Sequence, residues 1–147
     1  MIERIQTELR GSLRAGDRTR TNALRLLLSA LQKAQKDRPA GEFGEADEQA
    51  VLRRERKQRL EAAETYRAAG QEGRAAAEEA DLPVIDEFLP APLTESELEL
   101  LVDAAVADAG ATSMRDMGAV MKLVGERSGG RADGRSASAL VRARLQG

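Results

Sequence analysis

Apolar positions at helical spacing open the chain and predict two successive helices. The apolar face of the first helix is formed by Ile2, Ile5, Leu9 and Leu13. Gly16 is typical of the position just after a helix end, and Asp17 can cap the helix that follows. The apolar stripe of this second helix is formed by Leu24, Leu27, Leu28 and Leu31. The second helix is expected to end before Pro39, and residues 40–45 form a predicted loop.

A long third helix is predicted over residues 47–69. Its inward positions are Val51, Leu52, Ala62, Tyr66 and Ala69. Residues 53–59 are charged nearly all round, which is typical of an exposed or interface-facing turn. Gly70 ends this helix, and a fourth begins near Gly73. Pro83 predicts a kink or a restart in the fourth helix, because proline lacks the N–H that a helix interior needs.

The clearest boundary is a Pro-Ala-Pro linker at residues 90–92. Just after it, Thr94 and Glu97 have the spacing of a capping box, which marks a new helix start. We therefore predict an all-α protein with an N-terminal helical bundle of about four helices over residues 1–90. A small three-helix tail domain is expected to follow over residues 91–147.

Three apolar stripes define the helices of the predicted tail domain. The first consists of Leu98, Leu101, Val102, Ala105 and Val106, and the second of Met114, Met117, Val120, Met121 and Val124. The methionine spacing favours core packing over an adaptable binding groove. Gly118 lowers helix stability, which indicates a close contact with a neighbouring helix. The third stripe consists of Ala137, Leu140, Val141 and Leu145, after a predicted N-cap at Asp133.

The composition supports the all-α prediction and excludes several kinds of chemistry. Alanine, a strong helix former, occurs 26 times, and only three residues are aromatic. The chain has no cysteine and no histidine, which excludes disulfides, thiol nucleophiles, thiolate or imidazole metal sites and an imidazole base. We expect no metal and no cofactor. Since no apolar run could span a membrane and no signal-peptide core opens the chain, we expect a cytoplasmic protein without a membrane partner.

Charge is distributed unevenly along the sequence. Residues 1–38 carry a net charge of +5, residues 39–112 carry −11 and residues 113–147 carry +4, within a total of −2. Such asymmetry is informative about partners rather than about the fold. The two basic ends favour a polyanionic partner, and solvated helix surfaces with chance clustering are the alternative explanation.

A glycine-rich turn with arginines on both sides joins the last two predicted helices. A turn of this kind before a helix N-terminus presents backbone N–H groups to an anion, and arginine forks match phosphate oxygens. The candidate RNA-binding residues are Lys122, Arg127, Gly129, Gly130, Arg131, Gly134, Arg135, Arg142 and Arg144. A secondary basic strip is formed by Arg14, Arg18, Arg20 and Arg25. An ordinary loop with solvated arginines explains the same composition, and the GxxxxGK[ST] motif of nucleotide hydrolases is absent.

Four segments resemble the GatB/YqeY family in its stand-alone, YqeY-like form. They are RERKQR with a following tyrosine, EFLPAPLTESEL around the linker, DMGAVM at 116–121 and GRADGR at 130–135. The resemblance implies an N-terminal helical bundle and a three-helix tail. It likens the tail to that of the B subunit of the tRNA-dependent amidotransferase, the part implicated in contacting tRNA. Pro83 departs from the family pattern, as does the turn before GRADGR, where relatives often carry a lysine.

Three functional hypotheses follow. The first is a non-catalytic accessory protein in translation that binds tRNA or another structured RNA and no DNA. Such RNA is read mostly by shape and phosphates, and the tail has no aromatic residue for stacking on single strands. The second is a helical interaction module that docks on a translation enzyme or the ribosome through residues 53–59 and the methionine-bearing helix. The third, implied by the family name alone, is carbon–nitrogen ligase activity with glutamine as amido-N-donor. The resemblance covers none of the B subunit's catalytic portion, so the third hypothesis has the least support.

Overall fold

The computed structural model describes all 147 residues and contains helices without strands, which confirms the all-α prediction. The chain divides into two compact units, Met1–Leu89 and Pro90–Gly147, each with its own apolar core. None of the helices combines the length and apolarity needed to cross a lipid bilayer.

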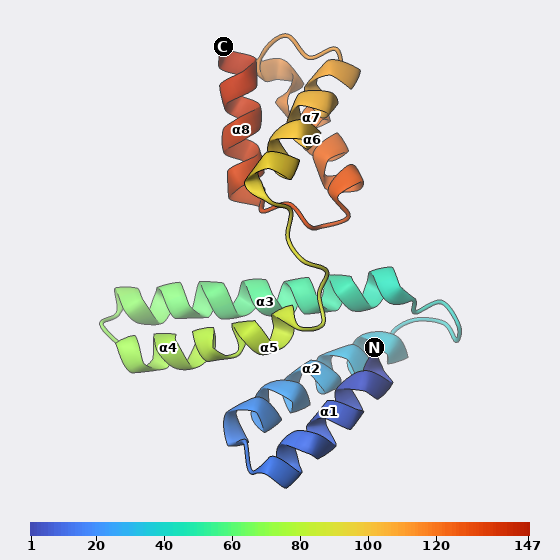
Figure 1. Ribbon diagram of the computed structural model, residues 1–147, viewed down its shortest axis with the longest axis vertical. Coiled ribbons are helices and arrows are strands. Elements are labelled where there is room, and N and C mark those ends of the chain that lie inside the picture. The colour runs from blue at the N-terminus through green and yellow to red at the C-terminus, as the bar shows by residue number, and fades with distance from the viewer. The chain divides into compact units, whose positions relative to one another are not determined.

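The first unit begins with a helical hairpin of α1 (Ile2–Ala15) and α2 (Arg18–Lys36) (Figure 1). Gly16 ends α1 in the left-handed conformation (φ 71°), which glycine adopts without the steric cost of a Cβ. Asp17 caps α2 by accepting a hydrogen bond from the backbone N–H of Arg20 (3.0 Å). The predicted stop and cap are thus both confirmed.

A second helical layer consists of α3 (Glu45–Ala68), α4 (Glu72–Ala80) and the short α5 (Leu82–Asp86). The predicted fourth helix restarts at Pro83, which lies in the first turn of α5 where its missing N–H costs nothing. The helices enclose an apolar core formed by Ile5, Ala23, Leu24, Leu27, Leu31, Val51, Leu52, Val84, Ile85 and Phe88.

Two expectations for α3 were wrong. Arg59, within the segment predicted to be exposed, is only 7% exposed. Its guanidinium donates to the Glu55 carboxylate (2.7 Å) and to that of Asp81 (3.4 Å), so the buried charge is paired on both sides. Ala69, predicted to point inward, lies exposed at the C-cap, because α3 ends one residue earlier.

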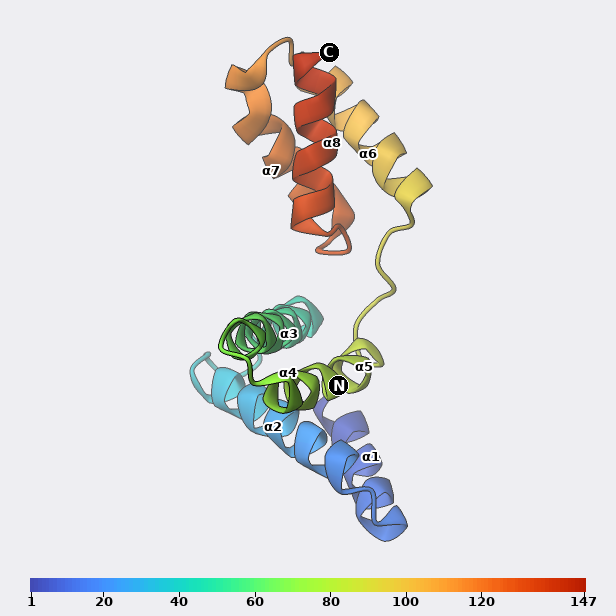
Figure 2. The same cartoon turned by 90° about the vertical axis from the view of Figure 1, so that its left-hand side faces the viewer.

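The second unit contains α6 (Glu95–Asp108), a single 3₁₀ turn η1 (Met114–Asp116), α7 (Met117–Ser128) and α8 (Gly134–Gln146). Each of the three α-helices packs against the other two (Figures 1 and 2). The predicted capping box at Thr94 is confirmed, since its hydroxyl accepts from the Glu97 N–H at 3.2 Å. The core of the unit is formed by Leu98, Val102, Ala105, Val120, Val124, Ala137, Val141 and Leu145.

The prediction that the methionine stripe packs on this core is confirmed for two of its three methionines. Met117 and Met121 are partly buried against it, while Met114 in η1 is 40% exposed. The prediction for Gly118 was wrong. A Cβ placed on Gly118 would have no atom of another element within 4 Å, so no neighbouring helix requires glycine there.

Candidate nucleic-acid interface

Two arginines near the C-terminal end of the chain, Arg127 and Arg144, are engaged with carboxylates of α6. Arg127 lies 2.7 Å from the Asp108 carboxylate. The Nε of Arg144 donates to Asp103 at 2.6 Å, and this hydrogen bond raises the pKa of the Arg144 guanidinium. Two of the candidate RNA-binding cations therefore have an internal partner of opposite charge.

Arg131 holds the beginning of its own unit in place. Its Nε donates to the backbone carbonyl of Ala91 (2.7 Å), and its carbonyl accepts from the backbone N–H of Leu93 (2.9 Å). One guanidinium nitrogen lies 3.9 Å from the Glu97 carboxylate. The glycine turn with its arginine thus attaches the linker segment to the three-helix unit.

The N-terminus of α8 already has a carboxylate cap. Both the backbone N–H (2.9 Å) and the hydroxyl (2.7 Å) of Ser136 donate to Asp133. This carboxylate occupies the place where an incoming phosphate would accept hydrogen bonds. Gly129 (φ 58°) and Gly130 (φ 79°) supply the left-handed turn before it, whereas Gly134 is simply the first residue of α8.

The remaining tail cations are spread over two helices. Lys122 on α7 and Arg142 on α8 are exposed and form no ion pair, and Arg135 is exposed in the first turn of α8. The unit Pro90–Gly147 contains seven Arg and Lys against eight Asp and Glu, a net charge of −1. Once folded, the basic C-terminal segment is therefore balanced by the acidic helix that it packs against.

A more continuous basic surface lies on α2. Its solvent-facing positions carry Arg18, Asn22, Arg25, Ser29, Lys33 and Lys36, all exposed. We call the four cations of this set, Arg18, Arg25, Lys33 and Lys36, the α2 basic face. At 100° per residue they share one side of the helix, opposite the buried stripe that ends at Leu31.

The α2 basic face has no internal counter-charge. No Asp or Glu occurs between Arg18 and Lys36, and none of the four cations forms an ion pair. At 1.5 Å per residue the face is about 27 Å long. Arg14, near the end of α1, is also exposed without an ion pair.

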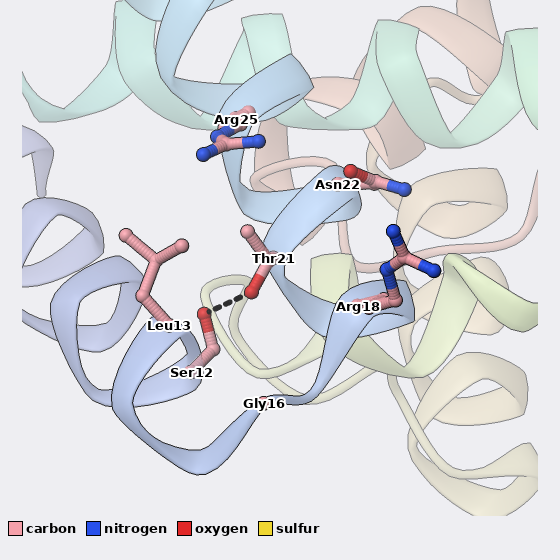
Figure 3. Close-up of a pocket in the computed structure, with 7 residues that line it drawn as sticks. All are labelled: Ser12, Leu13, Gly16, Arg18, Thr21, Asn22 and Arg25. Carbon is pink, nitrogen blue, oxygen red and sulfur yellow. Dashed lines mark hydrogen bonds between the residues drawn. The ribbon is translucent and has the colours of Figure 1, made fainter.

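An open hollow of about 350 Å³ lies between the end of α1 and the start of α2. It is lined by Ser12, Leu13, Gly16, Arg18, Thr21, Asn22 and Arg25. Figure 3 shows Arg18, Asn22 and Arg25 extending from α2 and Leu13 from α1. The hydroxyls of Ser12 and Thr21, both buried, share a hydrogen bond of 2.9 Å that ties the two helices together.

Arg20 differs from the other members of the predicted basic strip. Its guanidinium donates to the carboxylates of Glu87 (2.7 Å) and Glu8 (3.0 Å), and the bond to Glu87 is the main reason that its pKa is raised. Arg20 therefore stabilises the first unit from a different side of α2.

Sequence reasoning missed Lys33 and Lys36. Both continue the spacing of Arg18 and Arg25 along one face of a segment without carboxylates, and this pattern was the signal that could have identified them. No group of three or more Asp and Glu side chains is arranged to hold a metal ion.

Comparison with known proteins identifies a family. The family model described as Yqey-like protein matches residues 2–145, nearly the full chain. No curated protein matches the sequence.

Proposed function

The chain belongs to the Yqey-like protein family, and we propose that this member is a non-catalytic accessory protein that binds structured RNA through the α2 basic face. One observation carries the proposal. Arg18, Arg25, Lys33 and Lys36 share an exposed face of one helix and have no carboxylate partner.

Unpaired cations of this kind are suited to phosphates. An arginine or lysine that already pairs with a carboxylate must give up that partner before it can pair with a phosphate. A solvated arginine or lysine has no such partner to lose, and its pairing with a phosphate releases counterions from the RNA, which favours binding. The length of the α2 basic face, about 27 Å, allows several phosphates of one backbone to be contacted at once. Folded RNA is read by its shape and its sugar–phosphate surface, and such reading requires no aromatic side chain.

The family resemblance favours tRNA as the RNA and implies a contribution from the tail. In the second unit, Lys122 and Arg142 have the exposed, unpaired character that binding requires. Arg127, Arg131 and Arg144 are occupied within the unit. We therefore assign the tail a subordinate part in binding and α2 the principal one.

The test is titration of tRNA at two salt concentrations. If about four phosphates are engaged, the logarithm of the binding constant should fall with the logarithm of salt at a slope of about −3. The double variant Arg18→Glu/Arg25→Glu should bind at least about tenfold more weakly and show a shallower slope. Both positions are exposed, so the fold should tolerate the change.

A matched control is Arg54→Glu/Lys57→Glu on α3. It makes the same change in net charge at exposed positions of the same unit. Affinity should then change far less than in the α2 variant. Equal losses in both variants would show that only net charge matters, and unchanged binding in the α2 variant would refute the proposed interface.

The docking-module alternative rested on two features that have roles within the fold. Of residues 53–59, Arg56 pairs with Asp86 (2.8 Å) and Arg59 is buried between carboxylates. The methionines of α7 pack on the core of their unit. A pull-down after nuclease treatment separates the alternatives, since a protein partner would survive the loss of RNA.

A further inference from the structure

We infer that the hollow between α1 and α2 is a binding site for a single unpaired nucleotide of the RNA held along α2. The inference rests on the proposed function and adds a substrate preference to it. RNA with a bulged or looped-out base would be favoured over a perfect duplex.

The lining of the hollow has the three kinds of group that a nucleotide engages. Arg18 and Arg25 provide guanidinium forks for the phosphate, and guanidinium planes also stack on bases. Asn22 provides an amide that can both donate to and accept from a base edge. Leu13 provides an apolar wall, and it is 51% exposed, so this wall is open to a ligand.

The hollow is formed in advance by the rigid corner of the hairpin. The backbone N–H groups of Gly16 and Asp17 donate to the carbonyls of Leu13 (3.2 Å) and Ser12 (3.1 Å), which fixes the turn. The Ser12–Thr21 hydrogen bond fixes the helices beneath it. A Cβ on Gly16 would meet no atom within 4 Å, so the turn leaves the space beside it open.

The hollow adjoins the α2 basic face. Arg18 and Arg25 belong both to the lining of the hollow and to the α2 basic face. A backbone that follows α2 therefore passes the mouth of the hollow, where a displaced base could enter between Leu13 and Asn22. Because an unpaired base costs little to displace, such RNA would gain the extra contacts without first losing a base pair.

The experiment compares two RNAs, a blunt duplex and the same duplex carrying one bulged nucleotide. The wild-type protein should bind the bulged RNA several-fold more tightly. Asn22→Ala, which loses one hydrogen-bonding group, should reduce this preference by about fivefold. Leu13→Ala, which loses part of the apolar wall, should reduce it as well. Affinity for the blunt duplex should stay within about twofold, and the salt dependence should be unchanged because no charge is altered.

The chain offers matched controls for both variants. Leu26, 53% exposed on α2, does not line the hollow, so Leu26→Ala removes an equally exposed leucine elsewhere. Gln35→Ala removes an exposed amide near the other end of α2. Both controls should keep the full preference for the bulged RNA.

The outcomes separate this inference from the proposed function. Equal affinity of the wild type for the two RNAs, or a preference that survives both Asn22→Ala and Leu13→Ala, would overturn the nucleotide site. RNA binding that still depends on Arg18 and Arg25 would in that case leave the proposed function standing. Vesicles containing phosphatidylserine form a second arm. Leu13-dependent vesicle binding, with no discrimination between the RNAs, would assign the hollow to lipid headgroups and also overturn the inference.

Discussion

The backbone carbonyl of Arg131 accepts a hydrogen bond from the backbone N–H of Leu93, while the side chain of the same arginine donates to the carbonyl just before Pro92. A turn between α7 and α8 is thereby joined to the segment that precedes α6. The first arginine of the GRADGR motif, Arg131, thus has a structural task that accounts for its presence without a ligand.

Replacing Arg131 tests this task. Arg131→Ala loses the 2.7 Å hydrogen bond to Ala91 and should lower the free energy of unfolding of the second unit by about 1 kcal/mol. Denaturant titration of the full chain measures the effect. tRNA affinity should change less than twofold, and a large loss of affinity at unchanged stability would instead return Arg131 to the RNA interface.

The buried cation of α3 is expected to matter more for stability. Arg59→Ala leaves Glu55 and Asp81 without their shared partner, at side-chain exposures of only 18% and 17%. Removing one member of a buried ion pair typically costs about 3 kcal/mol. Urea unfolding gives the value, and Arg54→Ala, at an exposed position without an ion pair, serves as the control. A loss below about 1 kcal/mol at Arg59 would mean that water solvates the cluster.

Gly118 offers a stabilising substitution. It lies in the first turn of α7 with open space around its Cβ position, so Gly118→Ala should raise the free energy of unfolding by about 0.5 kcal/mol. Gly129→Ala should have the opposite effect, with a loss of about 1 kcal/mol, because φ is 58° at that position. Thermal unfolding of both variants provides the comparison. Destabilisation by Gly118→Ala would reveal a contact at that position.

The turn between α3 and α4 should make stability depend on pH. Hydrogen bonds from Arg67 lower the pKa of Glu72 from its ordinary value of 4.5. A carboxyl with a lowered pKa in the folded state stabilises the protein above its unfolded pKa, and this contribution is lost as pH falls through the folded value. Glu72→Gln should therefore be less stable than the wild type at pH 7, and the difference should shrink below about pH 4.5.

Arg67→Gln provides an independent check on this pair. It removes the donor rather than the acceptor, together with the hydrogen bond that Arg67 donates to Glu79, so it should abolish at least the same part of the pH dependence. Unfolding measured from pH 7 to pH 3 compares the three proteins. A wild type and a Glu72→Gln variant that differ equally at every pH would contradict the ion pair as the cause.

Local signals in the sequence determined the helix boundaries well. Asp17, Thr94 and Asp133 each bond to a backbone N–H three residues ahead. Such caps depend only on neighbours in the chain, so they can be predicted from spacing alone. The proline at 83 and the glycine at 16 act equally locally.

Charge could be read only as a sum along the chain, because pairing depends on the tertiary fold. The C-terminal arginines look like a basic segment until α6 brings Asp103 and Asp108 beside Arg144 and Arg127. Likewise, the burial of Arg59 could be predicted only with the knowledge that Asp81 lies next to it in the fold. RNA binding by the candidate tail site stays a prediction. Since Arg127, Arg131 and Arg144 have partners within their own unit, the α2 basic face is the first surface to test.

The absence of carboxylates on α2 has a consequence for the helix itself. Its first turn carries arginines and no acidic residue, so the N-cap Asp17 supplies the carboxylate at the positive end of the helix. Like charges along one side also repel each other. In the free protein the cations of the α2 basic face therefore repel one another, and a bound polyanion would reduce this repulsion. Added electrolyte should weaken the repulsion along this face in the free protein while it loosens the complex, so that one stripe of side chains produces two responses of opposite sign.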